Sequence, residues 1–259
     1  KHYKILKKAI TRDSSFDLVY GNAGAVITLI NMYQLTGNKE YIASAEIAGD
    51  IIVNAQEKEG SIKGGWNGDG RTSPLAGFSH GASGIVLLDG IKFENSLFVK
   101  EKGNWKDERV YAGEKASDGG SFTVAWCHGA AGILLSRSKV NVILNGRYSD
   151  LIENDIKVAV NTILKEGILG NNCLCHGNLG NTEILFEYLK DHSDKKIEKY
   201  YVDIRDIIAE NVCNGVFDCD NAYLYGYKLQ GFMTGLCGMG YSLLRDIKKD
   251  LPCVIALEV

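Results

Sequence analysis

Apolar residues recur at steps of three and four in three segments of the chain, which is the period of a helix with one buried face. In residues 39–56, acidic and asparagine side chains fall between the apolar positions. The second segment follows Asp150, the expected N-cap, and contains Ile152, Ile156, Ala159 and Ile163. The third contains Ile197, Tyr200, Ile204 and Ile207. All three segments are predicted to be amphipathic helices.

Segments of another kind are apolar nearly all round, and each follows two glycines three residues apart. The pairs are Gly21 and Gly24, Gly81 and Gly84, Gly129 and Gly132, Gly177 and Gly180, and Gly235 and Gly238. Such self-similarity indicates a repeated two-helix unit. Helices that are apolar all round lie inside a fold, and one-sided helices lie outside it. The sequence therefore predicts an all-α fold in which an inner ring of helices is wrapped by an outer ring.

The glycines are expected where the chain turns tightly into each inner helix, because a residue without Cβ lets two backbones approach closely. If all inner helices start at the same end, the residues just before the first glycines surround one rim. These residues are Tyr20, His80, His128, His176 and Thr234.

Charge and composition exclude some classes of function. The formal net charge is −3, and no cluster of lysine and arginine marks one face, which argues against nucleic-acid binding. The longest apolar stretches fall short of the roughly 18 residues that a membrane span needs, and no signal segment opens the sequence. A cytoplasmic protein is expected. Because Lys1 already stands close to a helical pattern, the 259 residues are expected to be part of a longer protein.

The chain has seven cysteines, an odd number without a dense framework, which is more typical of reduced thiols or metal ligands than of a secreted disulfide scaffold. The sequence does not decide whether Cys213 and Cys219 form a disulfide. Cys213, Cys219, Cys237 and Cys253 are expected to be structural.

Two thiols and one imidazole stand in equivalent places of neighbouring repeats, as Cys127, Cys175 and His176. Three protein ligands and an open fourth position make up a catalytic zinc site, and soft ligands favour zinc over magnesium or calcium. Cys173 is an alternative to Cys175 but is out of register with Cys127. The sequence predicts Zn²⁺ bound by Cys127, Cys175 and His176.

Two further histidines, His80 and His128, precede glycines in the same way, and histidine exchanges protons near neutral pH. Beside a metal they are candidate acids and bases, although each is also compatible with a hydrogen-bonded core histidine. Asp17 stands at the comparable place of the first repeat. It either orients a rim histidine or caps the next helix.

The motifs GFSHGASGI, AWCHGAAGI and CLCHGNLGN, with the ending GFMTGLCGMGYSLLRDIKKDLPCVIALE, resemble the lanthionine synthetase C-like family. The resemblance is greatest to the C-terminal cyclase domain of class II lanthipeptide synthetases. It implies a double α/α-toroid of seven repeats, of which five are visible here, with residues 1–259 forming one cyclase-like domain.

The resemblance also implies an activity: peptide cysteine thiols add to dehydroalanine or dehydrobutyrine and form thioether rings. By motif, Cys127, Cys175 and His176 match the family's zinc ligands, His80 its acid/base histidine, and Asp17 its active-site aspartate. His128 matches a position that helps beside the metal. The implied partners are a dehydrated precursor peptide with its leader and the dehydratase domain of the parent chain.

Other functions remain open. One alternative is a non-catalytic, zinc-stabilised scaffold that binds peptides or glutathione. Another is a zinc prenyltransferase or a carbohydrate-active enzyme on a similar helical toroid. The glycine-rich residues 58–77, with Trp66, are expected on the rim, either contacting peptide or as a solvated loop.

Overall fold

The computed structural model describes residues 2–68, 74–85, 88–108, 121–143, 149–219 and 230–258. The chain divides into two compact units, an N-terminal unit that ends at Phe122 and a C-terminal unit that begins at Thr123. A single domain over residues 1–259 stays a prediction. Among the described residues, no helix is both long enough and apolar enough to cross a membrane.

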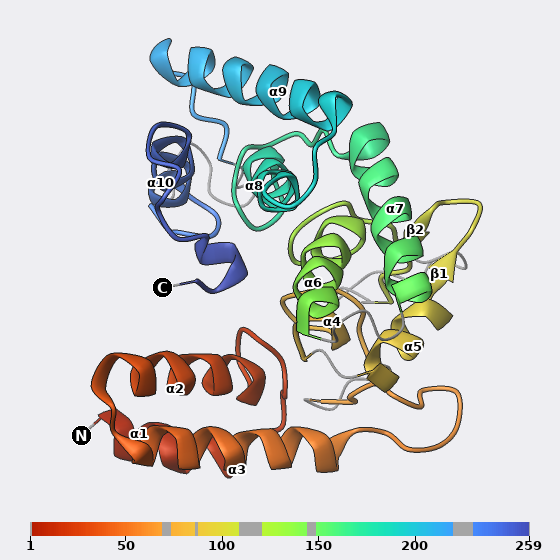
Figure 1. Ribbon diagram of the computed structural model, residues 1–259, viewed down its shortest axis with the longest axis vertical. Coiled ribbons are helices and arrows are strands. Elements are labelled where there is room, and N and C mark those ends of the chain that lie inside the picture. The colour runs from red at the N-terminus through yellow and green to blue at the C-terminus, as the bar shows by residue number, and fades with distance from the viewer. Residues whose placement is uncertain are drawn as a thin grey trace, which may run out of the picture. The chain divides into compact units, whose positions relative to one another are not determined.

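The N-terminal unit is built from helices and one small hairpin (Figure 1). Its helices are α1 (His2–Ile10), α2 (Asn22–Thr36), α3 (Lys39–Ala55), α4 (Ala82–Ile85) and α5 (Leu88–Ser96). Strands β1 (Phe98–Val99) and β2 (Asn104–Trp105) pair antiparallel, with Phe98 opposite Trp105.

Helices α2 and α3 form a hairpin whose turn is specified locally. Gly37 ends α2 with φ of 69°, in the left-handed region that favours glycine, and donates its N–H to the carbonyl of Tyr33. Asn38 then caps α3 by accepting the N–H of Glu40 at 3.0 Å. The expected apolar stripe of α3 is confirmed, since Ala45, Ala48 and Ile52 are buried.

The prediction for Trp66 was wrong. Its ring is buried, it packs with Ala23, Ile52, Ala82 and Phe93, and its Nε1–H donates to the carbonyl of Ile52 at 2.8 Å. A large aromatic ring reaches this core from a glycine-rich segment because the neighbouring glycines leave room for the backbone to pass close to α5. Trp66 therefore stabilises the N-terminal unit and is not part of a solvated rim. Residues 69–73 of the same segment lie outside the described residues.

The C-terminal unit contains the layered arrangement that the repeats predict (Figure 1). Its helices are α6 (Ala130–Ile143), α7 (Ser149–Glu166), α8 (Asn178–Leu189), α9 (Lys195–Cys213) and α10 (Leu236–Ile247), followed by the 3₁₀ helix η1 (Val254–Ala256). The glycine-led helices pack in order, α6 on α8 and α8 on α10, while α7 packs on α6 and α9 on α8. The all-α fold is therefore confirmed, and closure of these layers into rings stays a prediction.

Burial separates the two kinds of helix. Most of α8 is buried on every side, from Leu179 to Leu185, whereas α9 buries only one stripe that includes Ile197, Ile204 and Ile208. The prediction fails for α2, of which Asn22, Ala23 and Leu29 alone are buried. The cause is packing, because α8 has α6, α9 and α10 around it, while α2 packs mainly against α3.

Two details of the helix predictions were wrong. Asp150 lies inside α7, which begins at Ser149, so it is a first-turn acid and not the N-cap. In α9, Ile207 is 60% exposed and Ile208 is buried in its place. The stripe moves by one position because the period of a helix is 3.6 residues and not a whole number. The N-cap of α9 is Asp194, which accepts the N–H groups of Lys196 and Ile197.

The glycine pairs act as expected at the helix starts. Helices α2, α8 and α10 begin directly after Gly21, Gly177 and Gly235, their N-cap residues. A Cβ on the second glycine would collide with the carbonyl oxygen of the residue six positions earlier, and this holds for Gly24, Gly84, Gly180 and Gly238. Each helix start therefore lies against the turn that leads into it, which fixes where the preceding side chains point.

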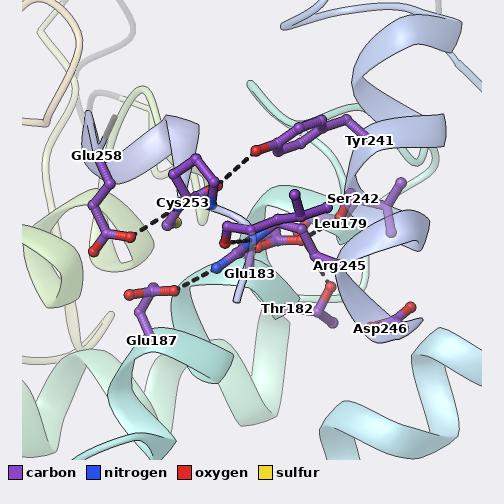
Figure 2. A network of polar contacts seen from close by, with 12 residues as sticks. Leu179, Thr182, Glu183, Glu187, Tyr241, Ser242, Arg245, Asp246, Cys253 and Glu258 are labelled. Carbon is purple, nitrogen blue, oxygen red and sulfur yellow. Dashed lines mark hydrogen bonds and ion pairs between the residues drawn. The ribbon is translucent and has the colours of Figure 1, made fainter. Parts of the chain in front are cut away.

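A buried polar network joins the helices of the C-terminal unit (Figure 2). Arg245 of α10 donates to the carboxylates of Glu183 and Glu187 on α8, and Ser242 donates to Glu183. From α9, Arg205 reaches Asp246 at 2.7 Å. Removing one partner of such a buried pair typically costs about 3–5 kcal/mol, because the other charge is left buried without compensation. The network thus holds α8, whose first turn follows the site described below.

Candidate metal centre

Cys127, Cys175 and His176 come together in the C-terminal unit, where each offers one ligand atom and all three atoms lie within 4.8 Å of one another. A tetrahedral zinc ion about 2.3 Å from each thiolate would hold two sulfur atoms about 3.8 Å apart. The separations of the three ligand atoms, none above 4.8 Å, are close to this distance. The structure therefore brings the three residues together, and their role as zinc ligands stays a prediction.

A tight turn presents Cys127. The N–H of Ala125 donates to the carbonyl of His128 at 3.1 Å, which closes the turn around Trp126 and Cys127. Gly129 leaves the turn with φ of 77°, a conformation that residues with a Cβ rarely adopt. Trp126 is fixed from its side chain, since its Nε1–H donates to the carbonyl of Ile255 at 2.9 Å.

Main-chain hydrogen bonds hold the neighbouring repeats in register at the cluster. Cys127 donates its N–H to the carbonyl of Cys175 at 3.3 Å, and Cys175 donates its own N–H to the carbonyl of Met233 at 2.8 Å. Cys175 and His176 are adjacent in sequence, but they stand on a turn rather than in a helix or strand, so both side chains can face one point. Both are partly exposed, which leaves the cluster open to a fourth ligand.

The donor set fits zinc. Two cysteine sulfurs and one histidine nitrogen are soft and borderline ligands, and three protein ligands with access from outside are typical of a catalytic zinc ion. Oxygen-rich coordination, which magnesium and calcium require, is absent from the cluster formed by Cys127, Cys175 and His176.

The other cysteines differ from these two. None of the seven is in a disulfide, which answers the open question about Cys213 and Cys219. Burial raises the pKa of Cys253 to about 11 and, with the nearby Cys173 and Asp218, that of Cys219 to about 11. Thiols of this kind stay protonated at neutral pH and are inert. Cys213 and Cys237 are exposed and do not pack in the core, so the prediction that they are structural was wrong for these two residues.

Asp17 and His80 form a hydrogen-bonded pair in the N-terminal unit. The Asp17 Oδ2 and the His80 Nδ1 are 2.9 Å apart, and the Asp17 Oδ1 accepts the N–H groups of Val19 and Tyr20. The ring of Tyr20 stacks on that of His80, with centroids 5.5 Å apart. Asp17 is buried. The two predicted alternatives for Asp17 are thus decided in favour of orienting the histidine, although it also holds its own turn.

His128 does not join the three-residue cluster among the described residues. It is only 1% exposed, and its carbonyl closes the turn that presents Cys127. Its placement is that of a buried residue behind the turn rather than of a solvated rim histidine. A catalytic role for His128 stays a prediction.

Sequence reasoning missed the polar side chains that hold these turns. The Glu94 carboxylate, fully buried, accepts the N–H groups of Gly77 and Ser83 on either side of His80. Asp13 accepts the N–H groups of Ser15 and Asn22 around Asp17. The sequence gives no signal for Glu94, because it stands among other polar residues of α5 and its partners include main-chain groups that no motif records.

Comparisons with known proteins identify the family of the chain. Residues 1–89 and 87–255 match the sequence profile of the family described as Lanthionine synthetase C-like protein. The chain is 27% identical to the Lacticin 481/lactococcin biosynthesis protein LcnDR2 of Lactococcus lactis subsp. lactis, over 91% of this chain and 26% of that protein. It thus spans about a quarter of the length of this relative.

Among solved structures, Nisin cyclase has the same fold, with a TM-score of 0.64 and 18% sequence identity, over 92% of this chain and 64% of that one. The family profile covers nearly the whole chain, including the cysteines and the histidine that meet at the cluster. The chain belongs to the lanthionine synthetase C-like family.

Proposed function

We propose that this chain is the cyclase portion of a lanthipeptide synthetase, which joins cysteine thiols of a dehydrated precursor peptide to dehydroalanine or dehydrobutyrine and so forms lanthionine and methyllanthionine rings. Family membership supports the reaction class, and the names of the two relatives refer to lacticin 481/lactococcin biosynthesis and to a nisin cyclase. The observation that carries the proposal is the convergence of Cys127, Cys175 and His176 on one point.

The three residues would hold a zinc ion, whose chemistry when bound is to deprotonate a coordinating thiol at neutral pH. Two cysteine ligands also neutralise the charge of the ion, which favours an electron-rich sulfur. The partial exposure of Cys175 and His176 leaves room for a peptide chain to approach. The protein then contributes orientation, because it holds the thiol and the alkene within reach of each other.

His80 is assigned the proton transfer. Addition of a thiol to the β-carbon of a dehydro residue leaves an enolate, and protonation at the α-carbon completes the thioether. A carboxylate accepts, so the pair with Asp17 places the ring proton on Nδ1 of His80. In the imidazolium form His80 also carries a proton on its other nitrogen, Nε2, and gives this proton to the α-carbon. Nε2 is protonated again from the solvent, which has taken up the proton of the peptide thiol. Asp17 is a positioning residue because it acts through the imidazole.

The proposed partners are a dehydrated precursor peptide with its leader and a dehydratase domain of the parent chain, and the proposed location is the cytoplasm. The relative from Lactococcus lactis is far longer than this chain, which supports a larger parent protein.

Cyclisation of a dehydrated precursor peptide tests the proposal. Mass spectrometry with an alkylating reagent counts the thiols that remain after incubation with the chain. Wild-type protein with zinc is expected to remove them, and both Cys127→Ala and zinc-free protein are expected to leave them. If Cys127→Ala still consumed thiols, the cluster would not be the reaction centre. If the wild-type chain bound zinc and peptide but left every thiol intact, the chain would be a binding scaffold.

A further inference from the structure

The loop of residues 171–178, here called the metal loop, is closed by a side chain from its own first residue. The amide of Asn171 accepts the N–H of Cys173 through Oδ1 at 3.0 Å and donates through Nδ2 to the carbonyl of His176 at 3.1 Å. Asn171 is 8% exposed. One buried amide therefore spans the loop and contacts the main chain of His176 directly.

Cys173 binds the other main-chain polar group of His176, its N–H. Its side chain is fully buried, and its Sγ accepts the N–H of His176 at 3.4 Å. The N–H and the carbonyl of His176 are thus both engaged within the metal loop, by Cys173 and Asn171. The two are in turn joined by the hydrogen bond from Cys173 to Asn171, so the three residues form a closed triangle.

The glycine after His176 is explained by this triangle. A Cβ at Gly177 would collide with Oδ1 of Asn171 and with the main-chain nitrogen of Cys173. The loop is also tied at its end, because Asn178 donates its N–H to the carbonyl of Asn171 at 2.9 Å. A residue larger than glycine would displace the amide and open the triangle.

We propose that Asn171 and Cys173 are positioning residues of the metal centre, which fix the main chain of His176 so that its imidazole and the Cys175 sulfur face the Cys127 sulfur before a metal arrives. This inference rests on the proposed function only in taking the cluster as a metal site. It also gives Cys173 a role other than that of a ligand. A site whose ligands are already aligned loses less conformational entropy on binding, and outer contacts of this kind typically change metal affinity 10- to 100-fold.

Metal titration of the full chain tests the inference without relying on catalysis. Cobalt(II) is added to the metal-free protein and its visible absorption is recorded, and zinc affinity is measured by competition with a chromophoric chelator. The variants are Asn171→Ala, Cys173→Ala and Cys173→Ser. The matched control is Asn178→Ala, which removes three side-chain hydrogen bonds of another asparagine in the metal loop, with the N–H and the carbonyl of Leu169 and with the side chain of Asn172.

Asn171→Ala and Cys173→Ala are expected to bind zinc about 10- to 100-fold more weakly than wild type, with shifted cobalt ligand-field bands and unchanged thiolate-to-cobalt absorption. Cys173→Ser keeps an acceptor for His176 and is expected to recover most of the affinity. Asn178→Ala is expected to bind as wild type does. Circular dichroism of the metal-free proteins separates these losses from unfolding, and the serine variant serves if either alanine variant does not fold.

Three results would overturn the inference. Wild-type affinity and spectra in both alanine variants would remove the positioning role, and an equal loss in Asn178→Ala would make the effect one of general loop stability. Loss of part of the thiolate-to-cobalt absorption in Cys173→Ala would make Cys173 a ligand. A wild-type chain that bound neither metal would defeat the proposed function as well, whereas the first three results leave that function standing.

Discussion

Both units join two neighbouring turns by a main-chain hydrogen bond, but the two units present different chemistry. In the N-terminal unit the N–H of Leu18 donates to the carbonyl of Ser79 at 3.2 Å, and in the C-terminal unit that of Cys127 donates to the carbonyl of Cys175 at 3.3 Å. In three of these four turns, those followed by Gly24, Gly84 and Gly180, a Cβ on the second glycine would collide with a main-chain carbonyl oxygen. The turns of the repeats are therefore a common support, and the side chains just before the glycines decide what each turn does.

The difference lies in those side chains. Two residues before the first glycine, the N-terminal unit has Val19 and Ser79, and the C-terminal unit has Cys127 and Cys175. The polar pair of the first unit, Asp17 and His80, is suited to proton transfer, because a carboxylate bonded to an imidazole fixes its tautomer. The cluster of the second unit is suited to a metal. In the proposed function, the groups for proton transfer and the groups for metal binding thus belong to separate units.

Loss of one thiol should produce the largest effect. In Cys175→Ala the metal site retains one sulfur and one nitrogen, so zinc content is expected to fall from about one ion per chain to nearly none. His80→Ala, in the other unit, is expected to keep its zinc. Zinc is measured by atomic emission after dialysis against a weak chelator. Equal zinc loss in both variants would contradict the separation of the two chemistries.

Loss of the imidazole should slow the reaction while the metal site stays filled. His80→Ala is expected to lower the rate of ring formation about 10²- to 10⁴-fold, the range for a general acid, and Asp17→Asn by less, because the imidazole remains. Single-turnover cyclisation with zinc-loaded protein measures both rates. An Asp17→Asn variant slower than His80→Ala would contradict the assignment of Asp17 as a positioning residue.

The shared support can be broken in either unit. Gly24→Ala and Gly180→Ala each place a methyl group against a main-chain carbonyl, of Leu18 and Leu174 respectively, and are each expected to lower the free energy of unfolding by about 1–3 kcal/mol.

Each variant has a matched control within a helix of its own unit. No atom lies within 4 Å of a Cβ built at Gly49 in α3 or Gly240 in α10. Gly49→Ala and Gly240→Ala are expected to stabilise by up to about 1 kcal/mol, because alanine favours the helix. Urea unfolding measures all four. Destabilisation by the controls as large as by the test variants would show that the contact with the carbonyl is not the cause.

Low pH should slightly lower the stability of the C-terminal unit, because the Glu258 carboxylate becomes protonated. Burial acts to raise the pKa of this carboxyl, but the N–H of Cys253 and the ammonium of Lys139 outweigh burial and hold it below its ordinary value of 4.5. A carboxyl whose pKa is lowered by folding stabilises above that ordinary value, and the contribution disappears as the pH falls through the folded-state pKa.

Because Lys139 and Glu258 are partly exposed, the effect is expected to be within about 1 kcal/mol. The free energy of unfolding of the wild-type chain should therefore fall more steeply below pH 4.5 than that of Glu258→Gln. Denaturant unfolding at several pH values measures both slopes. Parallel slopes would contradict a role for this carboxylate.

The repeated features were predictable from sequence, because they depend on local physics. A glycine pair ahead of an apolar run marks a helix start, and equivalent places in neighbouring repeats brought Cys127 and Cys175 together. Trp66, Asn171 and Glu94 were not predictable in this way. Their roles depend on which main-chain group folds against them, and a side chain that bonds a carbonyl or an N–H leaves no pattern in the sequence.

Burial was also only partly predictable. The sequences after Gly21 and Gly177 look alike, yet α8 is buried on all sides and α2 is not. Apolar residues show that a helix can be buried, and the neighbours present decide whether it is. In the same way, a histidine before a glycine does not show whether its side chain joins the cluster with the two cysteines, as that of His176 does and that of His128 does not.

X-ray absorption at the zinc edge tests the central claim most directly. For the zinc-loaded chain, two sulfur neighbours at about 2.3 Å and one nitrogen at about 2.0 Å are expected from the protein, with a third sulfur on addition of a cysteine-containing precursor peptide. Absence of zinc, or a sulfur count unaffected by both the peptide and Cys175→Ala, would contradict the account.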